Sequence, residues 1–146
     1  FMRELSINLG GVFNMCKAAI SELKKQEGST IVNVGSDLGV RPIPERIGYC
    51  PSKAGVIMLP KCIALEYAPS IRVNAILPGL VRTPMIEQRF TEAEDPKALE
   101  ESYASLYPLH KMGKIEDMAN AIAFLSSDES GFITGEIMQV CGGSLI

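Results

Sequence analysis

Apolar residues recur at three- and four-residue steps in three stretches of the chain, which is the period of one face of an α-helix. The first stretch predicts a helix over Met2–Gln26, which Gly28 then ends. The second predicts a helix over Tyr49–Tyr67, and the third a helix over Glu116–Ser126. Pro60 lies inside the second helix, where its missing N–H is expected to kink or strain the backbone.

Three short runs of apolar and β-branched residues lack the helical period and are bounded by turn-forming residues. They are Ser29–Gly35, Ile71–Leu77 and Ile137–Val140. Because they are too short for helices, we expect them to be buried strands. Strands that alternate with helices favour a parallel, doubly wound sheet. The predicted fold class is therefore α/β, with residues 1–146 in a single domain.

Two segments between these elements have no regular pattern. Asp37–Gly48 contains two prolines and two glycines, which predicts a loop. Residues 81–109 combine charged, helix-forming stretches with scattered aromatic residues. A long excursion of this kind within a compact domain indicates a lid or binding loop, or a disordered segment.

The composition limits the classes of partner. Hydrophobic residues make up 47% of the chain and charged residues 21%, with a net charge of −3, as in ordinary globular proteins. No basic run indicates a nucleic-acid partner, and no apolar run reaches the roughly 20 residues that span a membrane. Because the chain begins with Phe1, we expect it to be processed, truncated or incompletely recorded.

The cysteines and the histidine limit the chemistry. No cysteine is part of a C-x-x-C pair, and the four are Cys16, Cys50, Cys62 and Cys141. We interpret them as reduced, buried thiols, which predicts a cytoplasmic protein. The single histidine, His110, indicates no metal site and argues against a Ser-His-Asp hydrolase. Ser36 also lies in V-G-S-D-L and not in the G-x-S-x-G pattern of many hydrolases.

The most informative stretch contains a tyrosine and a lysine four residues apart, Tyr49 and Lys53. On a helix this spacing places both side chains on one face. An ammonium group beside a phenol favours the phenolate, so the pair can act as a general acid or base. Ser36 lies thirteen residues earlier, at a predicted strand end, where its hydroxyl could polarise a carbonyl oxygen. On the spacing alone, a packed aromatic residue with its hydroxyl at the surface is the more common explanation.

Motifs along the rest of the chain resemble, in order, those of the classical short-chain dehydrogenase/reductase family. Ile7–Leu9 resembles the helix with the family's catalytic asparagine, Asn33–Ser36 the strand that ends in its catalytic serine, and Tyr49 with Lys53 its Tyr-x-x-x-Lys pair. Ile71–Gly79 resembles the strand that runs into its Pro-Gly turn, and Gly113–Gly135 part of its closing helix and strand.

The resemblance implies a hydride transfer between NAD or NADP and a ketone or secondary alcohol. The implied catalytic residues are Asn8, Ser36, Tyr49 and Lys53. The implied cofactor contacts are Tyr49, Lys53, Pro78, Gly79, Val81 and Thr83. A substrate pocket formed by Leu38, Val40, Leu80 and Met85 is expected to be apolar, which favours a substrate with a hydrophobic portion. The family resemblance also implies a homo-oligomer, a tetramer, with an isologous interface.

The resemblance covers only the C-terminal part of such enzymes. No G-x-x-x-G-x-G turn is present, although the family's N-terminal Rossmann half uses this turn to hold the cofactor pyrophosphate. Residues 1–146 are therefore interpreted as a partial domain, the catalytic part with its lid, and are expected to be inactive alone. A non-catalytic oligomerisation remnant of such an enzyme is the alternative interpretation.

Overall fold

Three parallel strands form the sheet of the computed structural model, which describes residues 1–146. They are β1 (Ser29–Val34), β2 (Ile71–Pro78) and β3 (Ile137–Val140), in the order β1-β2-β3. Asn33 of β1 lies opposite Ala75 of β2, which lies opposite Ile137 of β3. The predicted α/β class and the three predicted strands are confirmed, each within one residue of its expected bounds.

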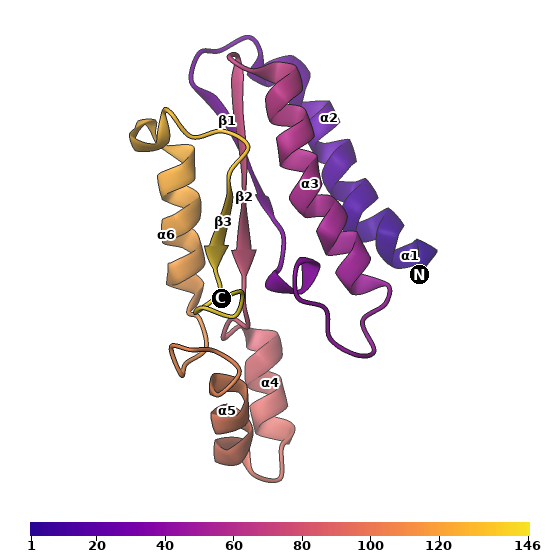
Figure 1. The fold of residues 1–146 in the computed structure, drawn as a ribbon, viewed down its shortest axis with the longest axis vertical. Helices are drawn as coiled ribbons and strands as arrows, with labels where there is room; N and C mark the ends of the chain where they lie inside the picture. Colours follow the sequence, from indigo (N-terminus) through magenta and orange to yellow (C-terminus); the bar gives the residue numbers. More distant parts are fainter.

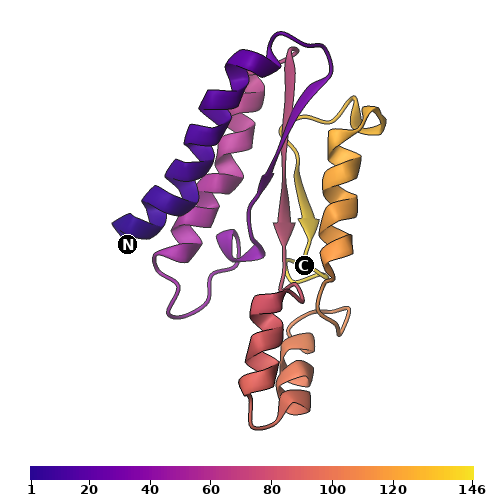
Figure 2. The same ribbon diagram turned by 180° about the vertical axis from the view of Figure 1, so that it is seen from behind.

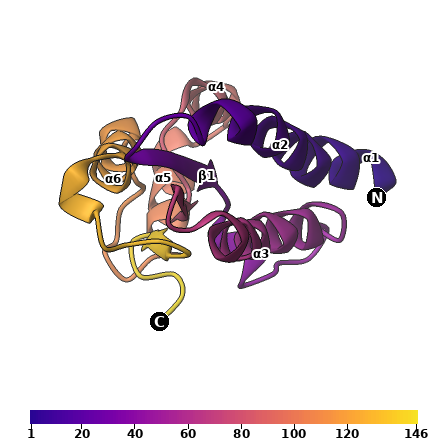
Figure 3. The same ribbon diagram turned by 90° about the horizontal axis from the view of Figure 1, so that it is seen from above.

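Helices cover both faces of this sheet. One side of the sheet has α1 (Met2–Leu5), α2 (Gly11–Leu23) and α3 (Tyr49–Tyr67). The other side has α6 (Ile115–Ser126) (Figures 1 and 3). A π-helical turn, η1 (Ser6–Gly10), joins α1 to α2. The first predicted helix is therefore continuous, but it contains this wider turn and ends at Leu23. The second helix runs through the buried Pro60.

The main hydrophobic core lies between α2, α3 and the sheet. Its buried members are Cys16, Ile63, Ala64, Ile71 and Val73. Cys16, Cys50 and Cys141 are buried as predicted, whereas Cys62 is exposed on α3, and all four thiols are free. Cys62 was expected to be buried because it lies in an apolar segment, but α3 has apolar residues on more than one face and only one face contacts the sheet.

Arg72 of β2 connects the sheet to the end of α6 by hydrogen bonds. Its guanidinium donates hydrogen bonds to the carbonyl oxygens of Leu125, Ser127 and Ile133 and to the hydroxyl of Ser130. The last carbonyl groups of a helix have no partner within the helix, so a charged donor at this position stabilises the helix end. This contact fixes α6 against the strands whose carboxyl ends carry the candidate site.

The segment predicted as a lid contains two helices, α4 (Pro84–Glu92) and α5 (Pro96–Ala104). Both lie together beyond the carboxyl ends of the strands (Figure 2). Their shared contact includes the rings of Phe90 and Tyr103, whose centroids are 5.8 Å apart. The sequence pattern did not resolve these helices because each is only nine residues long; α4 buries only Ile86 and Phe90, and α5 has no buried residue. No helix of the protein is both long enough and apolar enough to cross a membrane.

Candidate active site

Ser36 follows β1 at the carboxyl end of the sheet and begins the 3-10 turn η2 (Asp37–Gly39). Its hydroxyl oxygen accepts a hydrogen bond of 3.2 Å from the N–H of Leu38, and the residue is buried. Gly39 lets this turn approach α3 closely: a Cβ atom there would lie 2.9 Å from the carbonyl carbon of Lys53. The glycine therefore holds the serine next to the start of α3.

Tyr49 is the first residue of α3, and Lys53 lies one turn later on the same face. The lysine ammonium is 5.8 Å from the centroid of the tyrosine ring and donates a hydrogen bond of 3.2 Å to the carbonyl oxygen of Val34. Burial lowers the pKa of Lys53 below that of a free lysine. The helix start thus carries a phenol and a partly desolvated cation beside the strand that ends at Ser36.

Asn8 is connected to Tyr49 through a residue that the sequence interpretation missed. The Asn8 amide donates to the hydroxyl of Ser52 at 3.1 Å, and that hydroxyl donates to the carbonyl oxygen of Tyr49 at 2.7 Å. Gly55 permits this contact between the π-helical turn and α3, because a Cβ atom there would lie 2.6 Å from Leu9 Cδ2. Ser52 is fully buried, so this connection is shielded from water.

Ser36 and Tyr49 line one cavity of about 740 Å³, which we call the catalytic-side cavity. Leu38, Leu80 and Met85, three of the four residues expected to form the substrate pocket, also line it. Val40 does not line it: this residue follows the end of η2 and is 55% exposed. Apolar residues make up half of the lining, as expected, but six charged residues also contribute to it: Glu4, Asp37, Arg41, Glu45, Arg46 and Arg89.

The residues predicted to contact the cofactor follow the carboxyl end of β2. Pro78 ends the strand, and Gly79 packs so closely on the Cys141 backbone that a Cβ atom would lie 3.2 Å from its Cα. Val81 then pairs with Gly113 in a parallel bridge, which holds the start of the lid segment against the segment before α6. The hydroxyl oxygen of Thr83 is buried and has no hydrogen-bond partner.

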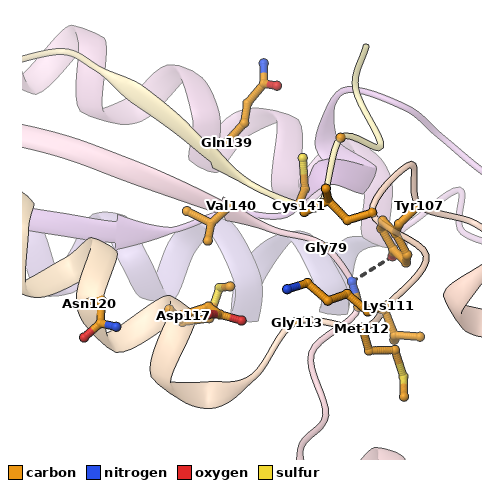
Figure 4. Close-up of a pocket in the computed structure, with 15 residues that line it drawn as sticks. Gly79, Tyr107, Lys111, Met112, Gly113, Asp117, Asn120, Gln139, Val140 and Cys141 are labelled. Atoms are coloured by element: carbon orange, nitrogen blue, oxygen red, sulfur yellow. Dashed lines mark hydrogen bonds between the residues drawn. The ribbon is translucent and has the colours of Figure 1, made fainter.

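A second cavity of about 490 Å³ lies between the ends of β2 and β3 and the start of α6 (Figure 4). We call it the α6-side cavity. Gly79, Leu80 and Tyr107 line both cavities. The Tyr107 hydroxyl accepts a hydrogen bond of 2.7 Å from the N–H of Leu80 (Figure 4). Burial raises the pKa of Tyr107. Tyr107 therefore anchors the end of the lid segment to the turn after β2.

Known proteins are similar to this chain over almost its whole length. A family model described as enoyl-(acyl carrier protein) reductase matches residues 1–144. The 3-oxoacyl-(acyl-carrier-protein) reductase FabG of Thermotoga maritima is 41% identical over 143 residues, which are 97% of this chain and 56% of that protein.

Solved structures of oxidoreductases are also similar to this chain in fold and sequence. ElxO with NADP bound has a TM-score of 0.88 at 33% identity, covering 94% of this chain and 55% of that one. NAD⁺-bound xylitol dehydrogenase has a TM-score of 0.87 at 34% identity, covering 98% of this chain and 59% of that one. The chain belongs to the short-chain dehydrogenase/reductase family, a family of Rossmann-fold enzymes. It spans between 55% and 59% of the length of these three relatives.

Proposed function

We propose that the protein is an oxidoreductase that interconverts a carbonyl group and an alcohol with NAD or NADP. The observation that carries the proposal is the meeting of Ser36 and Tyr49 in one cavity, with Lys53 one helical turn from the tyrosine. These groups come from two elements that the fold brings together at the carboxyl end of a parallel sheet, where open α/β sheets bind their ligands.

Each polar group has a distinct part in the proposed reaction. When bound, NAD or NADP would supply the hydride chemistry: the reduced form would give a hydride to the carbonyl carbon, and the oxidised form would take one from the alcohol. Tyr49 donates its hydroxyl proton to the substrate oxygen during reduction and recovers a proton afterwards. Ser36 donates a hydrogen bond to the same oxygen and stabilises the charge that develops there. Lys53 holds the nicotinamide ribose, and Asn8 orders a water molecule that passes a proton on from Lys53.

The residues after β2 fit a nicotinamide ring and its ribose. Thr83 has a buried hydroxyl with no partner in the protein, and such a group is costly unless a ligand or water satisfies it. Pro78, Gly79 and Val81 lie on the same segment, which the bridge to Gly113 holds in place. Tyr49 and Lys53 complete the proposed cofactor contacts. Two relatives hold NADP and NAD⁺ respectively, which supports either form of the cofactor.

The lining of the catalytic-side cavity supports a small-molecule substrate with both an apolar portion and a polar or charged group. Leu38, Leu80 and Met85 provide apolar contacts. Three arginines also line the cavity, and none of them forms a salt bridge with a carboxylate: Arg41, Arg46 and Arg89. A ketone or secondary alcohol of this mixed character matches the cavity better than a wholly apolar one.

Substitution of the tyrosine tests the proposal directly in the full-length protein. Tyr49→Phe removes only the hydroxyl, so kcat should fall by about two orders of magnitude or more while cofactor affinity is retained. Steady-state kinetics and a cofactor titration would measure both quantities. Tyr67→Phe, which removes a hydroxyl at the far end of α3, serves as the matched control and should retain its kcat.

The alternative function is a non-catalytic assembly module that retains the helices of an enzyme. Exposed apolar residues on α3, such as Met58 and Leu65, favour self-association. The same kinetic experiment separates the two functions, because an assembly module would show no turnover in the wild-type protein, whereas unchanged turnover of Tyr49→Phe would exclude only the proposed role of the tyrosine.

A further inference from the structure

The turn after β3 reaches back to the catalytic serine through a buried carboxylate. Ser144 donates a hydrogen bond of 2.8 Å to Oδ2 of Asp37, across 107 positions of the chain. Oδ1 of the same carboxylate accepts a longer hydrogen bond, of 3.3 Å, from the hydroxyl of Ser36. All three residues are buried, with exposed fractions of 8% for Ser36, 3% for Asp37 and 6% for Ser144.

The backbone of this turn is shaped for the contact. Gly142 and Gly143 have φ values of 58° and 88°, in the left-handed region that favours glycine. They turn the chain directly after Cys141, and the N–H of Ser144 then donates to the carbonyl oxygen of Cys141 at 3.1 Å. The side chain of Ser144 is thereby directed at a residue of η2, an element that belongs to the opposite end of the sequence.

Asp37 competes with the substrate for the proton of Ser36. A hydroxyl has one hydrogen, so Ser36 cannot donate fully to the carboxylate and to a substrate oxygen at the same time. A buried carboxylate needs hydrogen-bond donors, and it takes them from the nearest available groups. Because Ser144 supplies one donor at short distance, the carboxylate holds the Ser36 hydroxyl only weakly, at 3.3 Å.

We propose that Ser144 is a positioning residue for catalysis: by satisfying Asp37, it orients the Ser36 hydroxyl while leaving its proton available to the substrate. The inference rests on the proposed function of Ser36 as the hydrogen-bond donor to the reacting oxygen. The turn after β3 carries no catalytic group itself, but through Asp37 and Ser36 it influences kcat.

The test is a double-mutant cycle in the full-length enzyme. Ser144→Ala removes the donor at Oδ2, so the carboxylate should draw the Ser36 proton more strongly. We expect kcat to fall about tenfold, the rate equivalent of one hydrogen bond's net contribution, with the KM for the cofactor unchanged. In a Ser36→Ala background the same substitution should change kcat by less than about twofold, because the group through which it acts has been removed.

Controls separate this role from a loss of folding. Ser130→Ala removes another buried hydroxyl, which bonds to Leu125 and Arg72 far from the site, and should lower stability without lowering kcat. Ser144→Cys keeps the size of the side chain with a weaker donor, should give an intermediate kcat, and carries the test if Ser144→Ala does not fold.

The outcomes are distinguishable. Equal losses of kcat for Ser144→Ala in both backgrounds, or no loss in either, would overturn the positioning role. If Ser36→Ala and Tyr49→Phe both keep near-normal turnover, the proposed function itself fails, whatever Ser144 does.

Discussion

At the residue scale, the environment of Lys53 has a consequence for stability. Burial lowers its pKa, so the folded protein binds this proton less tightly than the unfolded chain does. As the pH rises from the lowered pKa toward 10.5, the ordinary pKa of a lysine, the cost of burying the charge disappears. The free energy of unfolding of the wild-type protein should therefore increase with pH in this window relative to that of Lys53→Gln.

Urea denaturation of the wild-type and Lys53→Gln proteins at pH 7 and at pH 10 would measure this difference. Lys61→Gln, on the exposed side of the same helix, is the matched control and should show the same pH dependence as the wild type. A constant difference between wild type and Lys53→Gln across the two pH values would mean that burial does not perturb this lysine.

A regular period connects only two residues of the candidate site, whereas Asn8 and Ser36 were predicted from their resemblance to family motifs. Tyr49 and Lys53 share a helix face because four residues make about one turn, and the structure places them accordingly. Ser52 lies between them in the sequence, but its bond to Asn8 depends on how two helices pack. The contact between Asp37 and Ser144 joins residues so far apart in the sequence that no local pattern reports it.

At the scale of elements, a close approach between η2 and α3 holds the candidate site together. A Cβ atom at Gly39 would lie 2.9 Å from Lys53 C and 3.0 Å from Ala54 N, both backbone atoms that cannot move away independently. Gly39→Ala should therefore destabilise the protein by about 1–3 kcal/mol, as overpacking does in cores, and should also reduce kcat by displacing Ser36.

Gly11→Ala provides the matched control for this prediction. Gly11 lies at the start of α2 with a helical φ of −60°, and no other atom would lie within 4 Å of an added Cβ. Alanine is the better helix former, so this variant should be more stable by roughly 0.5–1 kcal/mol. Thermal unfolding of both variants would compare them, and a stable, fully active Gly39→Ala protein would contradict the role of the close approach.

The sequence predicted the type and order of the main elements because each has a strong apolar pattern. It did not predict the π-helical turn at Asn8, which contacts α3 and leaves no mark on the periodicity. Nor did it resolve α4 and α5, whose helical stretches were recognised only as part of an irregular segment. The break between them falls at residues 93–95, where Asp95 caps the second helix by accepting from the N–H of Ala98.

At the scale of the whole molecule, α3 presents apolar residues to solvent as well as to the sheet. Met58, Cys62 and Leu65 follow one another at four- and three-residue steps, and all three are exposed; Leu65 is 88% exposed. An apolar stripe of this kind on a helix is typical of an interface. The stripe supports the expectation of a homo-oligomer, a tetramer, in which α3 packs against its own copy around a two-fold axis.

Light scattering of the full-length protein at micromolar concentration should therefore give the mass of an oligomer, a tetramer. Leu65→Glu places a charge on the stripe at a residue that is 88% exposed in the single chain, where an isologous contact would bury it without a partner, so the assembly should shift toward smaller species. Ser102→Glu, which adds the same charge on the exposed surface of α5, should leave the mass unchanged. A monomeric wild-type protein, or a Leu65→Glu protein of unchanged mass, would show that this stripe is not the interface.

Because α3 also begins with Tyr49, an interface along it would hold the catalytic helix in place, and the Leu65→Glu protein should lose kcat in proportion to its dissociation.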